Sequence, residues 1–305
     1  MTRQRIIVTG GTGFIGSRVV ARLVDKGERV TVLTRDPSRA PSSVEAVSWD
    51  LEGGSVDRAL LADTAAVVHL AAYRPAKLDD PRHAERCLLA NGIGTLRLLE
   101  DVVGAGVPVL INVTAANAYR DTGRPAREDD ALFPSGRAPY YLVSKVVQEV
   151  FGDHFAKRFP LRVVSLRPSA VYGPGMGPSG LIPTLAGRLR AGDPVDLADG
   201  GRYSADLVYV DDVVDAVVTA IQRPVNGAFN IASGRLVSAL EIAETIATLC
   251  SRSRELLRLQ PAGGSPAGGF CALEITRAQD ELGFQPRTLE AGLRSYLTWA
   301  NRQES

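Results

Sequence analysis

Short apolar runs alternate with helix-periodic segments through the first two thirds of the chain. Arg5–Thr9 (RIIVT) is apolar and β-branched and ends at glycines, as a strand buried in a parallel sheet does. In Phe14–Lys26 apolar residues recur every three or four positions, which predicts a helix that Gly27 ends. The same alternation predicts strands at Val30–Thr34, Val44–Trp49, Ala66–Leu70, Pro108–Val113 and Leu161–Leu166, and helices at Arg82–Val103 and Tyr141–Phe159. This order predicts an α/β fold with a doubly wound, parallel, Rossmann-type sheet.

The segment between the first strand and its helix is rich in glycine. Thr9–Gly16 reads TGGTGFIG. In this context the first glycine gives a tight turn, the second lets the backbone approach a pyrophosphate, and the third lets the helix pack close to the strand. The free N–H groups at the helix N-terminus favour phosphates. The loop therefore predicts dinucleotide binding, and the residues expected at the cofactor are Gly10, Thr12, Gly13, Phe14, Ile15 and Gly16.

The end of the second strand indicates which dinucleotide is favoured. An acidic residue there binds the ribose 2′-hydroxyl of NAD. This strand instead ends in Thr34 and is followed by Arg35. An arginine suits the 2′-phosphate of NADP because it forms charge-assisted, bidentate hydrogen bonds. We therefore expect NADP as the cofactor, with NAD less favoured and Arg35 at the phosphate.

The strand–helix alternation stops after Pro168. Gly173–Gly180 (GPGMGPSG) is too rich in breakers for regular structure, and 261–269 (PAGGSPAGG) is a second such segment. Beyond position 173 no βα unit repeats. We expect a dinucleotide-binding domain over residues 1–172, with segments near 207–232 returning to it. Residues 173–305 are expected to form mainly a smaller, C-terminal, substrate-binding lobe.

Tyr141 and Lys145 lie four residues apart in a predicted helix, so they share one helix face. A tyrosine has an ordinary pKa of about 10, and a nearby ammonium lowers that pKa by favouring the phenolate. With the positive nicotinamide, such a phenol can move a proton to or from a substrate oxygen. The pair therefore predicts catalysis by Tyr141, with Lys145 lowering its pKa and holding the nicotinamide ribose.

With these motifs the chain resembles the extended short-chain dehydrogenase/reductase family, of the NAD(P)-dependent epimerase/dehydratase type. Further matching segments follow in family order: Asp50-Leu51, His69–Ala72, Asn91–Thr95, Arg167-Pro168 with Val171–Gly175, Leu207–Asp212 and Asp280–Phe284. The resemblance implies a homodimer formed through the helices near 82–103 and 141–159. It also implies that the cofactor is contacted by Asp50, Leu51, Leu70, Ala71, Ala72, Val113, Tyr141, Lys145, Pro168, Ala170 and Val171.

The sequence departs from the family where a third catalytic residue is expected. The family has a Ser or Thr four places before a tyrosine, and the matching position before Tyr119 is Ala115. Thr114 is adjacent, but neighbouring residues at a strand end point to opposite faces, so it serves only if the strand end twists or bulges. Thr114, Asn117 or a water fills the role, or the substrate needs less polarisation, or catalysis is weak. Thr114 is our candidate for the third catalytic residue.

The positions that serve nucleotide sugars also differ. Ala116 and Asn117 stand where related dehydratases carry an acid and a base, which disfavours dehydration. Ala205 replaces the arginine that holds a nucleoside diphosphate in related epimerases, and 266–269 (PAGG) replaces the loop that carries a second one. An ordinary UDP- or dTDP-sugar is therefore disfavoured, unless Arg188, Arg190 or Arg202 supplies the charge.

These observations predict an NADP(H)-dependent oxidoreductase. It would move hydride between nicotinamide and a carbonyl or alcohol carbon of a small polar substrate, such as a keto-sugar or natural-product intermediate. A nucleotide-sugar epimerase that retains its cofactor is the alternative, and Ala115 keeps open a non-catalytic dinucleotide sensor or scaffold. The two glycine-rich segments are expected to close over the substrate. Candidate substrate contacts are Tyr73, Asn117, Tyr119, Ser169 and Tyr203.

Charge and cysteine content exclude several other classes. The chain has 35 Lys+Arg and 34 Asp+Glu in 305 residues, a formal net charge of +1, which gives no electrostatic footprint for nucleic acid. No apolar stretch approaches the length of about 18 residues that a membrane span needs. Cys87, Cys250 and Cys271 are widely spaced and suit reduced thiols. We expect a cytoplasmic protein with no nucleic-acid or membrane partner and no metal.

Overall fold

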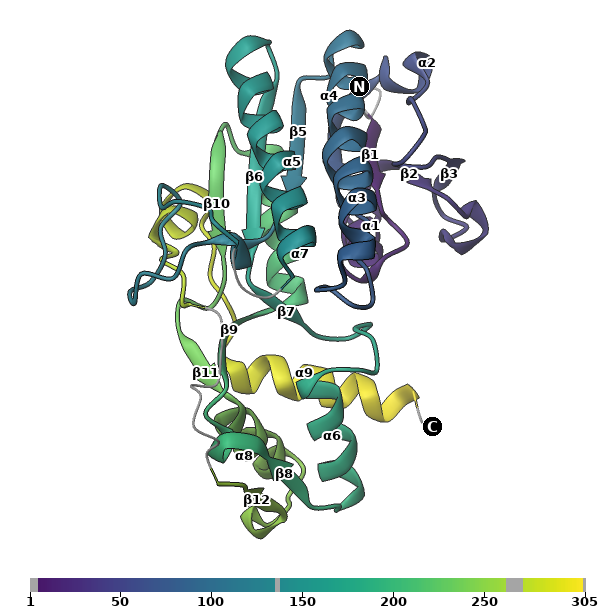
Figure 1. Ribbon diagram of the computed structural model, residues 1–305. Coiled ribbons are helices and arrows are strands. Elements are labelled where there is room, and N and C mark those ends of the chain that lie inside the picture. The colour runs from purple at the N-terminus through teal and green to yellow at the C-terminus, as the bar shows by residue number, and fades with distance from the viewer. Residues whose placement is uncertain (1–4, 135–137, 262–270, 304–305) are drawn as a thin grey trace.

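A seven-stranded parallel sheet forms the larger of two lobes (Figure 1) in the computed structural model, which describes residues 5–134, 138–261 and 271–303. Its strand order is β10-β6-β5-β4-β1-β2-β3. The strands are β1 (Arg5–Thr9), β2 (Arg29–Thr34), β3 (Glu45–Ser48), β4 (Thr64–His69), β5 (Val109–Val113), β6 (Arg162–Pro168) and β10 (Gly227–Ile231). The reversal of order at β1 and β4 makes the sheet doubly wound, which confirms the predicted fold class.

Helices cover both faces of this sheet because its strands are apolar on both sides. Ile6 and Val8 of β1 pack with α1 (Phe14–Asp25) and α7 (Val210–Gln222). Ile7 points the other way, into a core shared with α4 (Gly94–Gly104) and α5 (Pro139–Arg158). The helix expected at Arg82–Val103 is assembled from η2 (Pro81–His83), α3 (Ala84–Cys87), the π-helical η3 (Leu88–Ile93) and α4. A short helix, α2 (Arg58–Leu61), precedes β4.

All six strands expected from the sequence are present, and β10 is a seventh. It pairs in parallel with β6 at the edge of the sheet, from Gly227 opposite Val164 to Ile231 opposite Pro168. The segment expected to return near 207–232 therefore holds both α7 and this edge strand. Gly173–Gly180 contains no helix or strand, as expected, whereas the second glycine-rich segment lies almost wholly outside the described residues.

A second lobe packs below the carboxyl ends of the strands (Figure 1). Its core joins α6 (Leu181–Ala191), α8 (Ala239–Leu249) and α9 (Leu289–Gln303). A small sheet, β11-β9-β7, lies between the lobes, and β12 pairs with β8 at the far end. These strands are β7 (Ala170–Tyr172), β8 (Val195–Leu197), β9 (Ser204–Tyr209), β11 (Leu236–Ser238) and β12 (Leu257–Leu259). Short 3-10 or π turns are η1 (Pro37–Arg39), η4 (Ala116–Ala118), η5 (Ala198–Gly201), η6 (Arg254–Leu256) and η7 (Ala278–Leu282).

Asp206 of β9 ties the small sheet to two other segments. Its buried carboxylate accepts hydrogen bonds from the backbone of Ser233, Gly234 and Leu273, and from the Ser233 hydroxyl. A buried charge is tolerated when it is hydrogen-bonded in this way. No helix among the described residues is long and apolar enough to cross a membrane, and the cytoplasmic location stays a prediction.

Candidate active site

The glycine loop follows β1 at the carboxyl edge of the sheet, and its tight path requires glycine at two positions. Gly10 has φ of +68°, and a Cβ there would lie 2.6 Å from the backbone nitrogen of Ala71. A Cβ on Gly16 would lie 2.1 Å from the carbonyl oxygen of Gly10. The loop is therefore pressed against the turn after β4 on one side and against α1 on the other. This is the close packing that the glycine spacing predicts.

A pocket of about 430 Å³ opens beside this loop. It brings together nine of the residues expected at the cofactor: Gly10, Thr12, Gly13, Arg35, Asp50, Leu51, Leu70, Ala71 and Ala72. Tyr73, a candidate substrate contact, lines it as well. Lining residues that the sequence motifs did not single out are Leu33, Trp49, Glu52, Arg74, Arg86 and Ala90, together with Thr34 and Arg39. The other expected cofactor residues do not line it; they are Phe14, Ile15, Gly16, Val113, Tyr141, Lys145, Pro168, Ala170 and Val171.

Two arginines stand at the end of this pocket next to β2. Arg35 follows the strand directly. Asp36 then caps η1, with its carboxylate accepting a hydrogen bond from the Ser38 backbone at 3.1 Å, and this turn carries Arg39 back to the same pocket. Arg35 is predictable from the sequence because it directly follows β2. Arg39 is not, because it reaches the pocket only through the η1 turn that Asp36 caps.

Tyr141 and Lys145 lie on one face of α5, and both are largely withdrawn from water. The Lys145 side chain is 3% exposed, and its Nζ donates to Oε1 of Gln148 at 2.6 Å. The Gln148 amide donates in turn to Oδ1 of Asn112 on β5. Burial lowers the pKa of Lys145 to about 7, although the negative charge of Glu149 opposes this shift. The lysine is thus held inside the protein by a chain of amide groups.

The expected lowering of the Tyr141 pKa is not found in the ligand-free chain. Burial raises the pKa of the Tyr141 phenol, and Arg74 is the positive charge that opposes the rise. The Lys145 ammonium is not among the charges that shift this pKa, and its Nζ donates to Gln148. The loss of water around the phenol outweighs the effect of nearby positive charge, and it depends on packing that the spacing of Tyr141 and Lys145 does not show.

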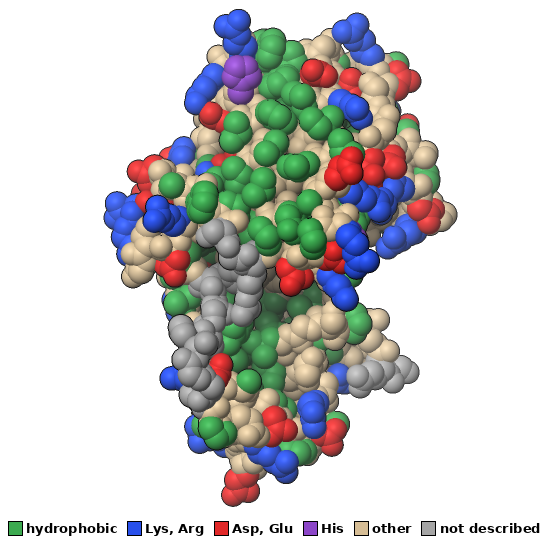
Figure 2. All heavy atoms as spheres, in the orientation of Figure 1, with side chains coloured by type: hydrophobic (Ala, Val, Ile, Leu, Met, Phe, Trp, Pro, Cys, Tyr) green, Lys and Arg blue, Asp and Glu red, His purple; other side chains and the backbone are tan. Residues whose placement is uncertain are grey.

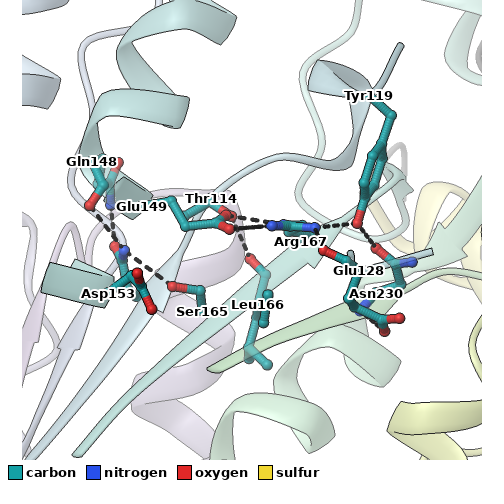
Figure 3. Close-up of polar contacts among 12 residues, drawn as sticks. Thr114, Tyr119, Glu128, Gln148, Glu149, Asp153, Ser165, Leu166, Arg167 and Asn230 are labelled. Carbon is teal, nitrogen blue, oxygen red and sulfur yellow. Dashed lines mark hydrogen bonds and ion pairs between the residues drawn. The ribbon is translucent and has the colours of Figure 1, made fainter. Parts of the chain in front are cut away.

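Figure 3 shows a polar network that joins α5 to β5 and β6. Both carboxylate oxygens of Glu149 accept from Nε of Arg167 at 3.0 Å. The Thr114 hydroxyl lies 3.0 Å from Oε2 of Glu149 and 3.2 Å from the carbonyl oxygen of Leu166. The Thr114 side chain therefore faces Glu149, and its one proton is used within this network. A catalytic contact by Thr114 stays a prediction that this arrangement does not favour.

Tyr119 belongs to the same network. Its hydroxyl donates to Oδ1 of Asn230 at 2.7 Å and accepts from a guanidinium nitrogen of Arg167. The side chain is 7% exposed, and burial raises the pKa of its phenol. Both hydrogen bonds of the Tyr119 hydroxyl therefore go to other residues of the protein, Asn230 and Arg167. Its expected substrate contact, like those of Asn117, Ser169 and Tyr203, stays a prediction.

The remaining expected residues cluster where strands end. Val113 ends β5, Pro168 ends β6, and Ala170 and Val171 begin β7. Ala115 and Tyr141 pack against the same small apolar cluster around Leu142. Ala115, which lacks a hydroxyl, therefore lies beside α5, the helix that carries the Tyr141 phenol.

A model of the NAD-dependent epimerase/dehydratase family matches residues 6–232. The chain belongs to this family. The resemblance found in the sequence motifs is thereby confirmed, and the family's NAD(P)-dependent oxidoreductase or epimerase chemistry applies to the protein. The protein is therefore an enzyme.

Members of the family that resemble the chain include both reductases and epimerases. A dTDP-4-dehydro-6-deoxy-D-allose reductase of Streptomyces bikiniensis is 29% identical over 97% of this chain and 96% of its own. A UDP-glucose 4-epimerase of Mycolicibacterium smegmatis is 32% identical over 93% of this chain and 94% of its own. Among solved structures, MoeE5 in complex with UDP-glucose and NAD has a TM-score of 0.83 and 30% identity, covering 99% of this chain and 100% of that one.

The segments that depart from other family members can be located in part. Ala205 is buried in β9, and the neighbouring Asp206 is committed to the hydrogen bonds described above. Arg202 is exposed and donates to the carbonyl oxygen of Asp199 at 3.2 Å. Arg188 is exposed on α6. The loop at 266–269 lies outside the described residues.

We expect the Lys145→Met variant to lose part of the pH dependence of folding stability. In the wild type the folded-state pKa of Lys145 is about 7, below its ordinary value of 10.5, so between these values the unfolded chain binds more protons. The free energy of unfolding should therefore rise with pH over this window, by up to about 1.4 kcal/mol per pH unit. Urea unfolding at pH 7.5 and 9.5 measures the rise. The rise should be smaller in Lys145→Met and unchanged in the control Lys157→Met, an exposed lysine on the same helix; equal rises in all three proteins would contradict the assignment.

Proposed function

We propose that the protein is an NADP(H)-dependent reductase that interconverts a ketone and an alcohol on a small polar substrate. The observation that carries this proposal is the Tyr141–Lys145 pair on α5, in which Lys145 is buried and Tyr141 is partly buried, at the same edge of the sheet as the glycine-loop pocket. The cradle at Gly10 and Gly16, which a Cβ would fill, fits a dinucleotide. In this proposal residues 1–172, with the returning segment near 207–232, bind the dinucleotide, and residues 173–305 mainly bind the substrate.

The chemistry of the chain's own residues follows from this arrangement. A bound nicotinamide dinucleotide would supply or accept the hydride. In the reducing direction Tyr141 gives its phenolic proton to the substrate oxygen. Burial raises the pKa of this phenol and so keeps the proton on it in the chain without cofactor. Lys145 holds the cofactor ribose and places a positive charge near the phenol when that proton leaves. Tyr73, which lines the pocket, is a substrate contact in this account, together with Asn117 and Tyr203.

We expect Tyr141→Phe to keep cofactor binding and lose turnover by at least about 10²-fold, because proton transfer by a positioned group contributes about 10²–10⁴-fold. Cofactor binding is measured by NADPH fluorescence, and turnover by oxidation of NADPH with dTDP-4-dehydro-6-deoxy-D-allose and with cyclohexanone. Tyr140→Phe, which changes the neighbouring tyrosine of α5, is the matched comparison and should keep wild-type turnover. A Tyr141→Phe enzyme as active as the wild type would refute the role.

Two arginines support NADP over NAD. Arg35 and Arg39 line one end of the pocket, and their side chains have no hydrogen bond or ion pair within the described part of the chain. Two guanidinium groups suit the doubly charged 2′-phosphate. Thr34, where an NAD-binding chain would carry an acid, has a hydroxyl 3.3 Å from that of Thr12 in the glycine loop.

We expect Arg35→Ala and Arg39→Ala each to weaken NADPH binding by about 10- to 100-fold. The reason is that a hydrogen bond to a charged group contributes about 1.5–3 kcal/mol. NADH binding should change by less than about threefold. Isothermal titration with both dinucleotides measures the difference, and Arg223→Ala, an exposed arginine after α7, is the control. Equal losses of affinity for NADPH and NADH would contradict the proposed preference for NADP.

A nucleotide-sugar epimerase is the second candidate, and the UDP-glucose 4-epimerase relative favours it. An epimerase returns the hydride to its substrate and so keeps its cofactor. Mass analysis of the dinucleotide released when the purified protein is denatured separates the two candidates. A dinucleotide that does not exchange with added NADPH favours the epimerase, and free exchange favours the reductase.

An exposed apolar face supports a homodimer. Leu88, Leu89 and Ile93 of η3 and Val143 and Val150 of α5 are 37–58% exposed. Figure 2 shows hydrophobic side chains gathered on this side of the larger lobe. A contiguous exposed apolar patch marks an interaction surface. Two copies that meet through this face would bury it in a self-complementary contact.

We expect Leu89→Glu and Val150→Glu each to give a monomer, because the added carboxylates would be buried without partners at the centre of the contact. Light scattering after size-exclusion chromatography measures the mass. Leu236→Glu, at a residue of β11 with 45% exposure away from this face, should stay dimeric. A wild-type protein that is monomeric at micromolar concentration would overturn the proposal.

A further inference from the structure

The end of β5 offers no free side-chain hydroxyl to a substrate. Thr114 is hydrogen-bonded within the Glu149 network, and Ala115 has no hydroxyl. A donor beside the reacting oxygen stabilises the charge that develops there and contributes a large rate factor in many enzymes. Another group of this chain must therefore donate the hydrogen bond to the reacting oxygen.

Ser169 carries a buried hydroxyl beside the end of β6. The residue is 7% exposed, and its Oγ has no hydrogen-bond partner among the described residues. Nearly all buried polar groups in folded proteins are hydrogen-bonded, so this hydroxyl is available to hydrogen-bond a bound molecule.

The strand register places this hydroxyl on the α5 side of the sheet. Val163, Ser165 and Arg167 of β6 line a groove that Glu149 of α5 also lines, whereas Val164 and Leu166 pack into the core on the α1 and α7 side. The Ser169 backbone nitrogen donates to the carbonyl oxygen of Ile231 at 3.0 Å, which continues the pairing with β10 past the end of β6. The alternation of side chains therefore extends to Ser169.

Ser169 thus lies at the carboxyl edge, one step beyond Arg167, on the face of the sheet that α5 covers. Tyr141 and Lys145 approach the same edge from α5, two turns and one turn before Glu149, respectively. Ala115, at the end of the neighbouring strand β5, is on the next chain segment along this edge.

We propose that the Ser169 hydroxyl donates the hydrogen bond that polarises the substrate oxygen on which Tyr141 acts, in place of the hydroxyl that Ala115 lacks. This inference rests on the proposed function. In the reducing direction the substrate carbon gains hydride and its oxygen gains the proton of Tyr141, while the nicotinamide is oxidised. Ser169 keeps its own proton throughout, because it only donates a hydrogen bond.

The test is Ser169→Ala, compared with the wild type in three measurements. We expect turnover of dTDP-4-dehydro-6-deoxy-D-allose or cyclohexanone with NADPH to fall about 10²–10³-fold. We expect the NADPH dissociation constant to change by less than about twofold. The melting temperature of the protein without cofactor should stay equal or rise, because alanine removes a buried hydroxyl that has no partner in the described part of the chain. This last measurement needs no substrate.

A hydroxyl restored at the neighbouring strand end should rescue the variant. We expect Ala115→Ser in the Ser169→Ala background to recover at least tenfold in turnover. Wild-type turnover in Ser169→Ala would overturn the inference, and so would a loss of turnover matched by an equal loss of NADPH affinity. A lower melting temperature of the ligand-free variant would show a structural hydrogen bond and would also overturn it. Tyr141→Phe assayed in parallel separates the two proposals: if it keeps turnover, the proposed function fails, whereas retained turnover in Ser169→Ala alone refutes only this inference.

Discussion

Charge buried beneath α5 is the constraint on which the candidate active site depends. Lys145 and Glu149 lie one turn apart on this helix, and both are withdrawn from water. A buried charge is tolerated only when it is paired or hydrogen-bonded. Glu149 meets this condition through Arg167 of β6 and Thr114, which follows β5, and Lys145 meets it through Gln148. These contacts fix the helix against two neighbouring strands, and the same rotation of the helix presents Tyr141 at the edge of the sheet.

The network has a chemical consequence for the strand ends. Because Glu149 and the Leu166 carbonyl take the Thr114 hydroxyl, the threonine next to Ala115 is turned into the protein. The two adjacent strand ends are then asymmetric. Thr114, after β5, has its hydroxyl engaged, whereas the Ser169 hydroxyl, after β6, has no hydrogen-bond partner among the residues that the structure describes. In the proposed mechanism the proton donor, Tyr141, lies on α5, and the second hydroxyl is that of Ser169, which follows β6. The segment after β6 thus takes the part that the segment after β5 would otherwise have.

Much of the fold followed from the sequence because its signals were local. Apolar β-branched runs and the glycine loop identified six strands, whereas β10 (GAFNI) was missed because it is short, begins with glycine and lies at the sheet edge. Residues joined by tertiary contacts were harder to predict. Arg39 reaches the pocket only through the turn that Asp36 caps, and the direction of Thr114 depends on Glu149, 35 residues away. The Tyr141 pKa was misjudged because burial depends on the packed structure.

The most direct test of the central claim is the pKa of Lys145 itself. The chain has only four lysines, so its ¹³C-labelled lysine side chains can be followed by NMR across a pH titration and assigned by their loss in Lys145→Met. The account predicts one lysine that titrates near pH 7 in the ligand-free protein. A midpoint near the ordinary value of 10.5 would show that this ammonium is solvated, and it would contradict the buried lysine on which the proposed function is built.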